Sequence, residues 1–327
     1  MKAAELTAIG PASDVVRCVE VAEPGKPGPG ELRVELTACS INPADLLLIE
    51  GGYANVPETP CPVGIEGAGI VTAVGEGVTA FVPGDKVMSL NRTNWTQQLL
   101  LTEAQVIRMP AEIDLEQAAM LKVNAATSLL MLRDYVTLAA GDWVIQDAAN
   151  SGVGVNLIRL ARADGIRTVN VVRRPELIEP LIAIGADVVL LDGDDLAARV
   201  AEATDGADIK LAIDAVAGPI VERLGDCLGD GGVVVNYGLL SGEPCQLRAD
   251  QVVFKDIRLM GFWLAKKMPA MSRDEVEALY GELATRVVDG TLSVPVTARY
   301  PLEDVSKAMA HAGTYGRDGK VLLRPNG

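Results

Sequence analysis

The 327-residue sequence contains a single histidine, His311, and this scarcity excludes whole classes of site. A metal site built from two or three histidines is impossible, and a Ser-His-Asp triad would have to use this one residue. His311 lies among small residues near the C-terminus, in the segment Lys307–Gly313. We therefore expect a surface or helix-terminal histidine rather than a catalytic one.

The five cysteines, at positions 18, 39, 61, 227 and 245, form no Cys-x-x-Cys pair. Their odd number and wide spacing disfavour a disulfide framework and a zinc cluster, and they indicate a reducing compartment. No apolar run approaches the roughly 18 residues of a membrane span. The N-terminus also lacks the long apolar stretch of a secretory signal and the Arg- and Ser-rich character of a transit peptide. We expect a cytoplasmic protein that does not bind membranes.

Positive charge is in deficit. Lysine and arginine total 29 and aspartate and glutamate total 44, which gives a net charge of -15. This balance disfavours binding to nucleic acid or to an anionic membrane, because phosphate contacts need a basic face. A content of 49% hydrophobic and 22% charged residues excludes wholesale disorder.

The chain changes texture twice, which predicts three segments. Residues 1–120 consist of short extended runs interrupted by Gly and Pro, typical of a small β-rich barrel. Residues 121–265 alternate apolar β-branched runs with helical stretches, which indicates a doubly wound parallel sheet. The pattern of residues 266–327 is again similar to that of residues 1–120. We expect this tail to pack on the barrel, because a separate domain of about 60 residues would have a thin core.

Six strands are predicted in the middle segment: Trp143–Gln146, Thr168–Val172, Val188–Leu191, Leu211–Ile213, Val233–Asn236 and Ile257–Phe262. The first of them is followed by a glycine-bearing turn and a helix, with the spacing Ala148-x-x-Ser151-x-x-Gly154 and an extra Gly152. Such a turn brings backbone N–H groups and a helix N-terminus to a pyrophosphate. Two glycines alone are also ordinary turn chemistry. The strand before, the helix after and the next strand about 20 residues on favour a dinucleotide site.

Arg173 and Arg174 follow the second predicted strand. NAD sites usually carry an acidic residue at this strand end, which binds the ribose 2′-hydroxyl. Two guanidinium groups instead suit a 2′-phosphate, which a carboxylate would repel. A solvated basic turn is the alternative. The position at the strand end favours NADPH over NADH.

With the motifs Gly64–Gly69 and Val82–Val87, the chain resembles the medium-chain dehydrogenase/reductase superfamily over nearly its full length. The resemblance implies an α/β fold class, in which a GroES-like β-rich catalytic domain contains an inserted Rossmann doubly wound parallel sheet. Zinc-dependent members carry Cys, His and Cys at three positions. Here Asn42 and Ile65 stand at the first two, and Lys122–Thr127 contains no cysteine. The resemblance therefore implies that there is no catalytic zinc.

Among zinc-free members the chain is most similar to the 2-enoyl-thioester reductases, the mitochondrial trans-2-enoyl-CoA/ACP reductase group. The shared motifs are Ile41–Asp45, Gly51–Tyr53, Asn94–Trp95, Val123–Asn124, Ala149–Gly154, Tyr237–Gly238, Phe254–Asp256 and Gly261–Leu264. The resemblance implies an NADPH-dependent oxidoreductase of fatty-acid or polyketide metabolism. It would reduce the C2–C3 double bond of a trans-2-enoyl thioester of CoA or acyl carrier protein, with hydride to C3 and a proton to C2. A homodimer joined at the Rossmann sheet edges is also implied.

Site residues follow from the same resemblance, position by position. Tyr53 matches the proton donor, and a loop tyrosine that packs on substrate is the alternative. Asn42 is expected to position the substrate carbonyl, and a loop-capping asparagine is the alternative. The expected cofactor-binding residues are Asn124, Asn150, Ser151, Gly152, Val153, Arg173, Arg174, Tyr237, Gly238, Leu239, Leu240, Phe262, Trp263, Leu264, Ala265 and Lys320. Trp263 could equally be a core residue and Lys320 a solvated lysine.

Two departures from the family pattern are visible. The turn Arg173–Pro175 is one residue shorter than the Arg-Asp-Arg-Pro that the family often carries, and Ile65 stands where the family often has asparagine. Two other functions remain open on this scaffold: a quinone or small-enone reductase, and a catalytically idle NADPH-binding protein. The fold alone does not choose among them. The net charge of -15 disfavours an acidic carrier protein as partner and so favours CoA thioesters.

Overall fold

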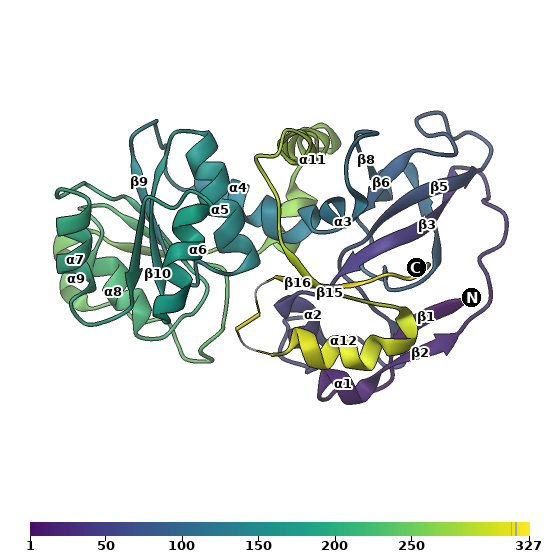
Figure 1. Ribbon diagram of the computed structural model, residues 1–327, viewed down its shortest axis with the longest axis horizontal. Coiled ribbons are helices and arrows are strands. Elements are labelled where there is room, and N and C mark those ends of the chain that lie inside the picture. Colours follow the sequence, from purple (N-terminus) through teal and green to yellow (C-terminus); the bar gives the residue numbers. More distant parts are fainter. Residues whose placement is uncertain (315, 318) are drawn as a thin grey trace. The chain divides into compact units, whose positions relative to one another are not determined.

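The computed structural model describes residues 1–314, 316–317 and 319–327. The chain divides into two compact units, which are shown in Figure 1. The first unit combines Met1–Val123 with Arg273–Gly327, and the second is Asn124–Ser272. The boundaries expected from the sequence, at 120/121 and 265/266, differ from this division by a few residues and stay a prediction.

The first unit is built around strand β3 (Glu31–Ser40). This strand pairs with β5 (Ala68–Val74), β7 (Gln98–Thr102) and β16 (Lys320–Leu323), all antiparallel. Strand β16 comes from the end of the chain, so the C-terminal segment completes a sheet that the N-terminal segment begins. The sheet also contains β6 (Lys86–Ser89), β8 (Val106–Arg108) and β15 (Val296–Tyr300), and a smaller sheet has the order β2-β1-β4, with β1 at Lys2–Leu6, β2 at Val16–Glu20 and β4 at Cys61–Pro62.

Alternation along β3 places Leu32, Val34 and Leu36 on one face, where all three are fully buried. Close strand contact requires glycine at position 69, because a Cβ there would lie 2.0 Å from the Glu35 carbonyl oxygen. The helices of this unit are α1 (Ala12–Val15), α2 (Pro43–Ile49), α3 (Leu115–Ala118), α11 (Arg273–Val288) and α12 (Val305–Ala312). His311 lies in α12, as expected near a helix end, and its Nδ1 is 3.0 Å from the Tyr300 hydroxyl.

The second unit contains a six-stranded parallel sheet in the order β11-β10-β9-β12-β13-β14. Its strands are β9 (Trp143–Gln146), β10 (Arg167–Val172), β11 (Val188–Leu191), β12 (Leu211–Asp214), β13 (Val233–Asn236) and β14 (Arg258–Gly261). The six strands predicted from the sequence are confirmed, to within one residue at each end. Apolar runs made these strands recognisable, and β9, β10, β12 and β13 are mostly buried, whereas β14 is exposed.

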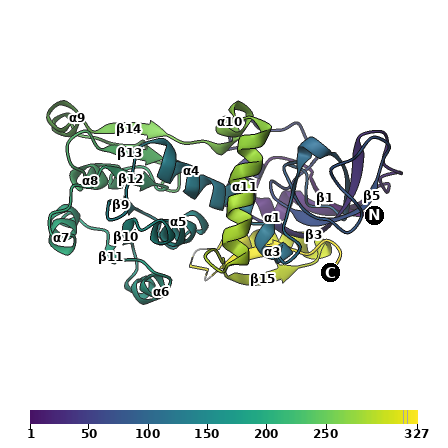
Figure 2. The ribbon, with the colours of Figure 1, turned by 90° about the horizontal axis from the view of Figure 1, so that it is seen from above.

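Helices cover both faces of this sheet (Figure 2). One face carries α4 (Ala126–Asp134), α5 (Gly152–Ala163) and α6 (Ile178–Ala183), and the other carries α7 (Leu196–Ala203) and α8 (Ile220–Asp226). The shorter helices α9 (Ala249–Lys255) and α10 (Leu264–Lys267) flank β14 in the sequence. The order of the strands reverses between β9 and β12, and ligands of such sheets bind outside the carboxyl ends of the strands at this point.

Two further expectations concern the whole chain. No helix of the described residues is both long enough and apolar enough to cross a membrane. All five cysteines, which are Cys18, Cys39, Cys61, Cys227 and Cys245, are free thiols.

Candidate functional site

In the first unit, Asn42 lies at the centre of a buried polar cluster. Its side chain is 2% exposed. Its Nδ2 donates to Glu66 Oε2 at 2.6 Å and to Ser40 Oγ at 3.1 Å, and its Oδ1 accepts from Lys320 Nζ. The amide is thus engaged on both sides by residues of its own unit, and it bridges a buried carboxylate and a buried ammonium. The expected role of Asn42 in positioning a carbonyl stays a prediction, and it would require this amide to exchange a partner.

Glu66 is fully buried and both of its oxygens accept hydrogen bonds. Oε2 accepts from Asn42 and from the Ser40 hydroxyl, and Oε1 accepts from the backbone amide of Val123 at 2.6 Å. Val123 lies in a single π-helical turn, η2 (Leu121–Ala125), an irregularity that is frequent at functional sites. Glu66 therefore binds the turn that contains Asn124, at the residue immediately before it.

Lys320, in β16, is only 7% exposed. Burial lowers its pKa to about 8, while the negative charges of Glu66 and Asp45 act in the opposite direction. Asp45 is also buried, and burial raises its pKa to about 6, although the backbone amides of Asn42 and Ile65 donate to its two oxygens at 2.8 and 3.0 Å. The cluster therefore contains groups that titrate near neutral pH.

A second lysine, Lys122, belongs to the π-helical turn. Its Nζ donates to the carbonyl oxygens of Ile65 at 2.7 Å, Leu90 at 2.8 Å and Asn91 at 2.6 Å. Burial lowers its pKa to about 7, and the charge of Glu66 raises it. Three carbonyl acceptors favour the ammonium form, because a neutral amine has only two N–H donors.

Tyr53 lies in the loop after α2, where Gly51 adopts φ +81, a conformation that favours glycine. The tyrosine is partly exposed, and the Arg92 guanidinium carbon lies 5.8 Å from its ring centroid. That separation is within the range of cation–π attraction. The structure places Tyr53 and Asn42 in the same unit, and the role of Tyr53 as proton donor stays a prediction.

The positions that carry zinc ligands in other superfamily members hold different chemistry here. Asn42 is bound to Glu66 and Lys320, Ile65 is apolar and buried, and Lys122 supplies an ammonium group. Throughout residues 1–314, 316–317 and 319–327, no three histidine, cysteine, aspartate or glutamate side chains are grouped so that they could hold a metal ion.

In the second unit, the turn after β9 has the backbone shape that a pyrophosphate requires. Ser151 is the N-cap of α5 and its Oγ accepts from the Gly154 amide at 3.0 Å. A Cβ at Gly154 would lie 2.4 Å from the Ala149 carbonyl oxygen, so only glycine permits this tight entry into the helix. The first N–H groups of the helix, at Gly152 and Val153, have no intrahelical acceptor. These groups fit an anionic ligand at the helix N-terminus.

Two predicted residues from distant segments lie against this turn. The side chain of Asn124 is buried. It lies next to Gly152, since a Cβ at that glycine would be 2.9 Å from Asn124 Nδ2. Tyr237, which follows β13, forms a hydrogen bond with Ser151. Burial raises the pKa of its phenol above the ordinary range, and the Ser151 bond opposes that shift. The structure thus brings Asn124, Ser151, Gly152 and Tyr237 together.

The two arginines follow β10, at the same end of the sheet. Arg173 is exposed, and Arg174 is partly exposed with its guanidinium 3.2 Å from Glu176. A pair between two such exposed side chains is weak. A phosphate could therefore replace Glu176 as the partner of Arg174.

The other predicted cofactor residues also lie past the carboxyl ends of strands. Gly238 must be glycine, because a Cβ there would lie 2.4 Å from the Ala215 carbonyl oxygen. Phe262 is buried and Trp263 is 38% exposed. The remaining ones are Asn150 after β9, Leu239 and Leu240 after β13, and Leu264 and Ala265 after β14. Lys320 alone belongs to the first unit, and its contact with NADPH stays a prediction.

Sequence reasoning missed Ser40, Asp45, Glu66 and Lys122 as members of the polar cluster. One signal was available, since Glu66 is a charged residue inside the apolar, glycine-rich segment Gly64–Gly69. A charged residue that is fully buried is almost always paired.

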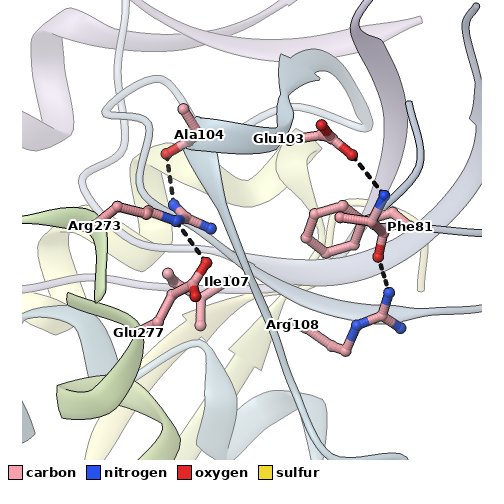
Figure 3. A pocket seen from close by; sticks show the side chains of 8 residues that line it. Phe81, Glu103, Ala104, Ile107, Arg108, Arg273 and Glu277 are labelled. Carbon is pink, nitrogen blue, oxygen red and sulfur yellow. Dashed lines mark hydrogen bonds and ion pairs between the residues drawn. The ribbon is translucent and has the colours of Figure 1, made fainter. Parts of the chain in front are cut away.

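A pocket of about 560 Å³ in the first unit, shown in Figure 3, contains none of the predicted site residues. Its two arginines already have partners. Arg273 donates to the Ala104 carbonyl at 2.9 Å and pairs with Glu277 at 2.6 Å, and Arg108 pairs with Asp85 at 2.5 Å. We assign no ligand to this pocket.

Comparison with known proteins identifies the family. Residues 28–110 match the alcohol dehydrogenase GroES-like domain, and residues 152–283 match the zinc-binding dehydrogenase family. The mitochondrial enoyl-acyl-carrier-protein reductase of Homo sapiens is 36% identical over 85% of this chain and 77% of its own length. The one of Xenopus tropicalis is 33% identical over 91% and 88%. The chain belongs to the enoyl-acyl-carrier-protein reductase family of the medium-chain dehydrogenase/reductase superfamily.

The predicted fold class, a GroES-like domain with an inserted Rossmann sheet, is confirmed by these matches. A solved structure of Escherichia coli quinone oxidoreductase in complex with NADPH is also similar. It superposes with a TM-score of 0.87 at 27% identity, covering 99% of this chain and all of the other. The scaffold of this family member is thus shared with a quinone oxidoreductase.

The Lys122 contacts generate a stability prediction. Replacing Lys122 by methionine removes three charge-assisted hydrogen bonds. The Leu90 carbonyl loses this donor, while the carbonyls of Ile65 and Asn91 keep a hydrogen bond from Asn94 Nδ2. We expect the free energy of unfolding to fall by about 3 kcal/mol. The matched control is Lys86→Met, since Lys86 donates to one carbonyl only, that of Ile113 at 2.6 Å. Its loss should be about 1 kcal/mol. Urea unfolding measures both, and equal losses would contradict the assignment.

Proposed function

We propose that this protein is an NADPH-dependent reductase of trans-2-enoyl thioesters, with CoA thioesters as substrates. The observation that carries the proposal is the nucleotide turn at the end of β9. Asn124 and Tyr237 converge on this turn, in a chain that is 36% identical to an enoyl-acyl-carrier-protein reductase. The preference for CoA over an acidic carrier protein rests on the net charge of -15.

The residues of the second unit fit a dinucleotide. The helix N-terminus at Ser151–Val153 would bind the pyrophosphate, and Arg173 and Arg174 would bind the 2′-phosphate. Residues after β13 and β14 would border the nicotinamide. NADPH, when bound, supplies a hydride to C3 of the enoyl thioester.

The first unit would supply the proton and the polar environment of the thioester. Tyr53 carries a phenolic O–H group, which can donate a proton to C2. The developing negative charge on the thioester oxygen needs a nearby donor. The cluster of Asn42 and Lys320 contains an amide and an ammonium that could serve. The proposed reaction needs neither a metal nor a nucleophilic side chain.

A quinone or small-enone reductase is the second candidate, and the similarity to the Escherichia coli quinone oxidoreductase favours it. An idle NADPH-binding protein is the third. The three candidates are distinguished by the rate at which NADPH is oxidised, followed as the loss of its absorbance at about 340 nm. The rate is measured with crotonyl-CoA, with a simple quinone, and with neither. Turnover with crotonyl-CoA supports the proposal. Turnover with quinone alone supports the second candidate, and binding of NADPH without any turnover supports the third.

Several finer points remain proposals. The exposed strand β14 forms an edge of the parallel sheet and is flanked by apolar side chains, of which Phe254 is 82% exposed and Val253 70%. Exposed apolar edges are sites of association, so we propose a homodimer joined at β14, which a solution mass measurement would test.

Five free thiols suit the reducing cytoplasm that we propose, which cell fractionation would test. The relatives described above are named as mitochondrial proteins, and that location is stated for those proteins only.

Substitution of Tyr53 tests the proton donor. Tyr53→Phe should lower kcat for crotonyl-CoA by about 100-fold, because the phenolic proton is lost while the ring remains. The affinity for NADPH should stay near the wild-type value. Tyr300→Phe removes a hydroxyl elsewhere in the same unit, one that bonds His311, and serves as the control. An unchanged kcat in Tyr53→Phe would make Tyr53 a packing residue.

Substitution of the arginine pair tests the choice of cofactor. Arg173→Ala combined with Arg174→Ala should weaken NADPH binding by about 100-fold and NADH binding very little, because only NADPH carries a 2′-phosphate. The control is Arg167→Ala at the opposite end of β10, which should affect neither. Titration of each nucleotide measures the affinities. Equal losses for NADPH and NADH would remove the 2′-phosphate assignment.

A further inference from the structure

Strands β9 and β12 are neighbours in the parallel sheet (Figure 2). Two aspartates, Asp147 and Asp214, lie at the carboxyl ends of these strands. Ile213 of β12 is in register with Gln146 of β9, so Asp214 and Asp147 are the next residues along. The Asp147 amide donates to the Ile213 carbonyl at 3.1 Å. Asp147 is 2% exposed and Asp214 is fully buried. Two carboxyl groups so placed cannot both ionise without a large electrostatic cost.

The hydrogen-bond donors around the pair are unequally shared. Asp214 Oδ1 accepts from the amides of Val216 and Ala217, at 3.0 and 2.9 Å, and its Oδ2 accepts from Asn236 Nδ2 at 2.5 Å. Asp147 receives one bond, from a backbone amide at 2.8 Å on Oδ1. Its Oδ2 is buried and has no donor among the described residues. Donors stabilise the ionised form, so the proton of the pair belongs on Asp147.

The surroundings of Asp147 agree with this placement. Burial raises its pKa well above the ordinary value, and Asp214 raises it further through a hydrogen bond and its charge. The other titratable groups that act on or near it are Asp192, Arg223, Tyr237 and Cys245. Asp192 is paired with Arg223 at 2.7 and 2.5 Å. Burial raises the pKa values of Tyr237 and Cys245, which favours the neutral form of both groups.

We propose that Asp147 is a protonated positioning residue, which donates from Oδ2 to the Asp214 carboxylate and so holds the turns that receive the cofactor. Asp147 begins the turn that ends at Ser151, and Asp214 anchors the turn at residues 215–217 through backbone amides. Each turn contains a residue in the left-handed region, Ala148 at φ +42 and Ala217 at φ +63. Such conformations persist only where the surroundings hold them.

This inference rests on the proposed function only in naming NADPH as the ligand. Loss of the proton would place a second negative charge at the strand ends, where the phosphates of NADPH are expected. The pair also links stability to pH. Below its raised pKa, folded Asp147 keeps a proton that the unfolded chain has already lost above about pH 4. The free energy of unfolding contributed by this group therefore falls as the pH rises between those two values.

Three substitutions distinguish the effect of the proton on Asp147 from the effect of the size of its side chain. Asp147→Asn keeps a donor to Asp214 and cannot ionise. Asp147→Leu has a similar volume and offers no donor. Asp208→Asn makes the same chemical change on an exposed residue before the start of β12, and is the matched control. Nucleotide fluorescence gives the Kd for NADPH between about pH 7 and about pH 10, and the Tm without nucleotide is measured in parallel.

In the wild type and in Asp208→Asn, the Kd should rise once the pH exceeds the raised pKa of Asp147, by up to about tenfold for each further pH unit. In Asp147→Asn it should change by less than about threefold, because the titrating group is gone. At about pH 7 Asp147→Asn should retain most of the affinity, whereas Asp147→Leu should lose about tenfold, the worth of one hydrogen bond to a charged group. The Tm should fall more steeply with pH in the wild type than in Asp147→Asn.

The proposal is overturned if Asp147→Asn shows the pH dependence of the wild type in both Kd and Tm. It is also overturned if Asp147→Asn binds as weakly as Asp147→Leu at about pH 7, because the carboxylate itself would then be needed. Failure of the proposed function has a different signature. In that case the wild type does not bind NADPH at any pH, and the comparison of Tm values still tests the shared proton.

Discussion

The buried carboxylate of Glu66 is the constraint around which the first unit is organised. A fully buried charge is costly unless it is paired and hydrogen-bonded. Here the Glu66 carboxylate accepts hydrogen bonds from Ser40 in β3, from Asn42 before α2 and from Val123 in the π-helical turn. Asn42 in turn accepts a hydrogen bond from Lys320 in β16. Hydrogen bonds to Glu66, direct or through Asn42, thus connect segments near the start, the middle and the end of the chain. Removing that carboxylate would leave three donors, from Ser40, Asn42 and Val123, without this acceptor.

In the second unit, the backbone is closely packed at the turns that follow β9 and β13. Glycines at 152, 154 and 238 make room where a Cβ would collide with neighbouring atoms. Beneath these turns, Asp147 is neutral in our account and Asp192 is paired with Arg223. The remaining negative charge is on Asp214, which is stabilised by the amides of Val216 and Ala217 and by Asn236 Nδ2.

The sequence predicted elements whose signal is local. Strands β9 to β14 were found because each is an apolar run bounded by turns, and the nucleotide turn because strand, glycines and helix are contiguous. The polar cluster was missed because its contacts are distant in sequence. Glu66 and Val123 are 57 residues apart, and Asn42 and Lys320 are 278 apart. The π-helical turn could not be predicted either, since its shape depends on that tertiary hydrogen bond. Lys320 donates to Asn42 in the first unit, and its expected contact with NADPH stays a prediction.

The central claim is that this chain delivers a proton to C2 and a hydride to C3 of an enoyl thioester. Reduction of crotonyl-CoA with unlabelled NADPH in deuterated water tests it most directly, with mass spectrometry and NMR to locate the label in the product. The account predicts one deuterium at C2, supplied by an exchangeable group such as the Tyr53 phenol, and none at C3. Deuterium at C3, or the absence of any butyryl product while a quinone is reduced, would contradict it.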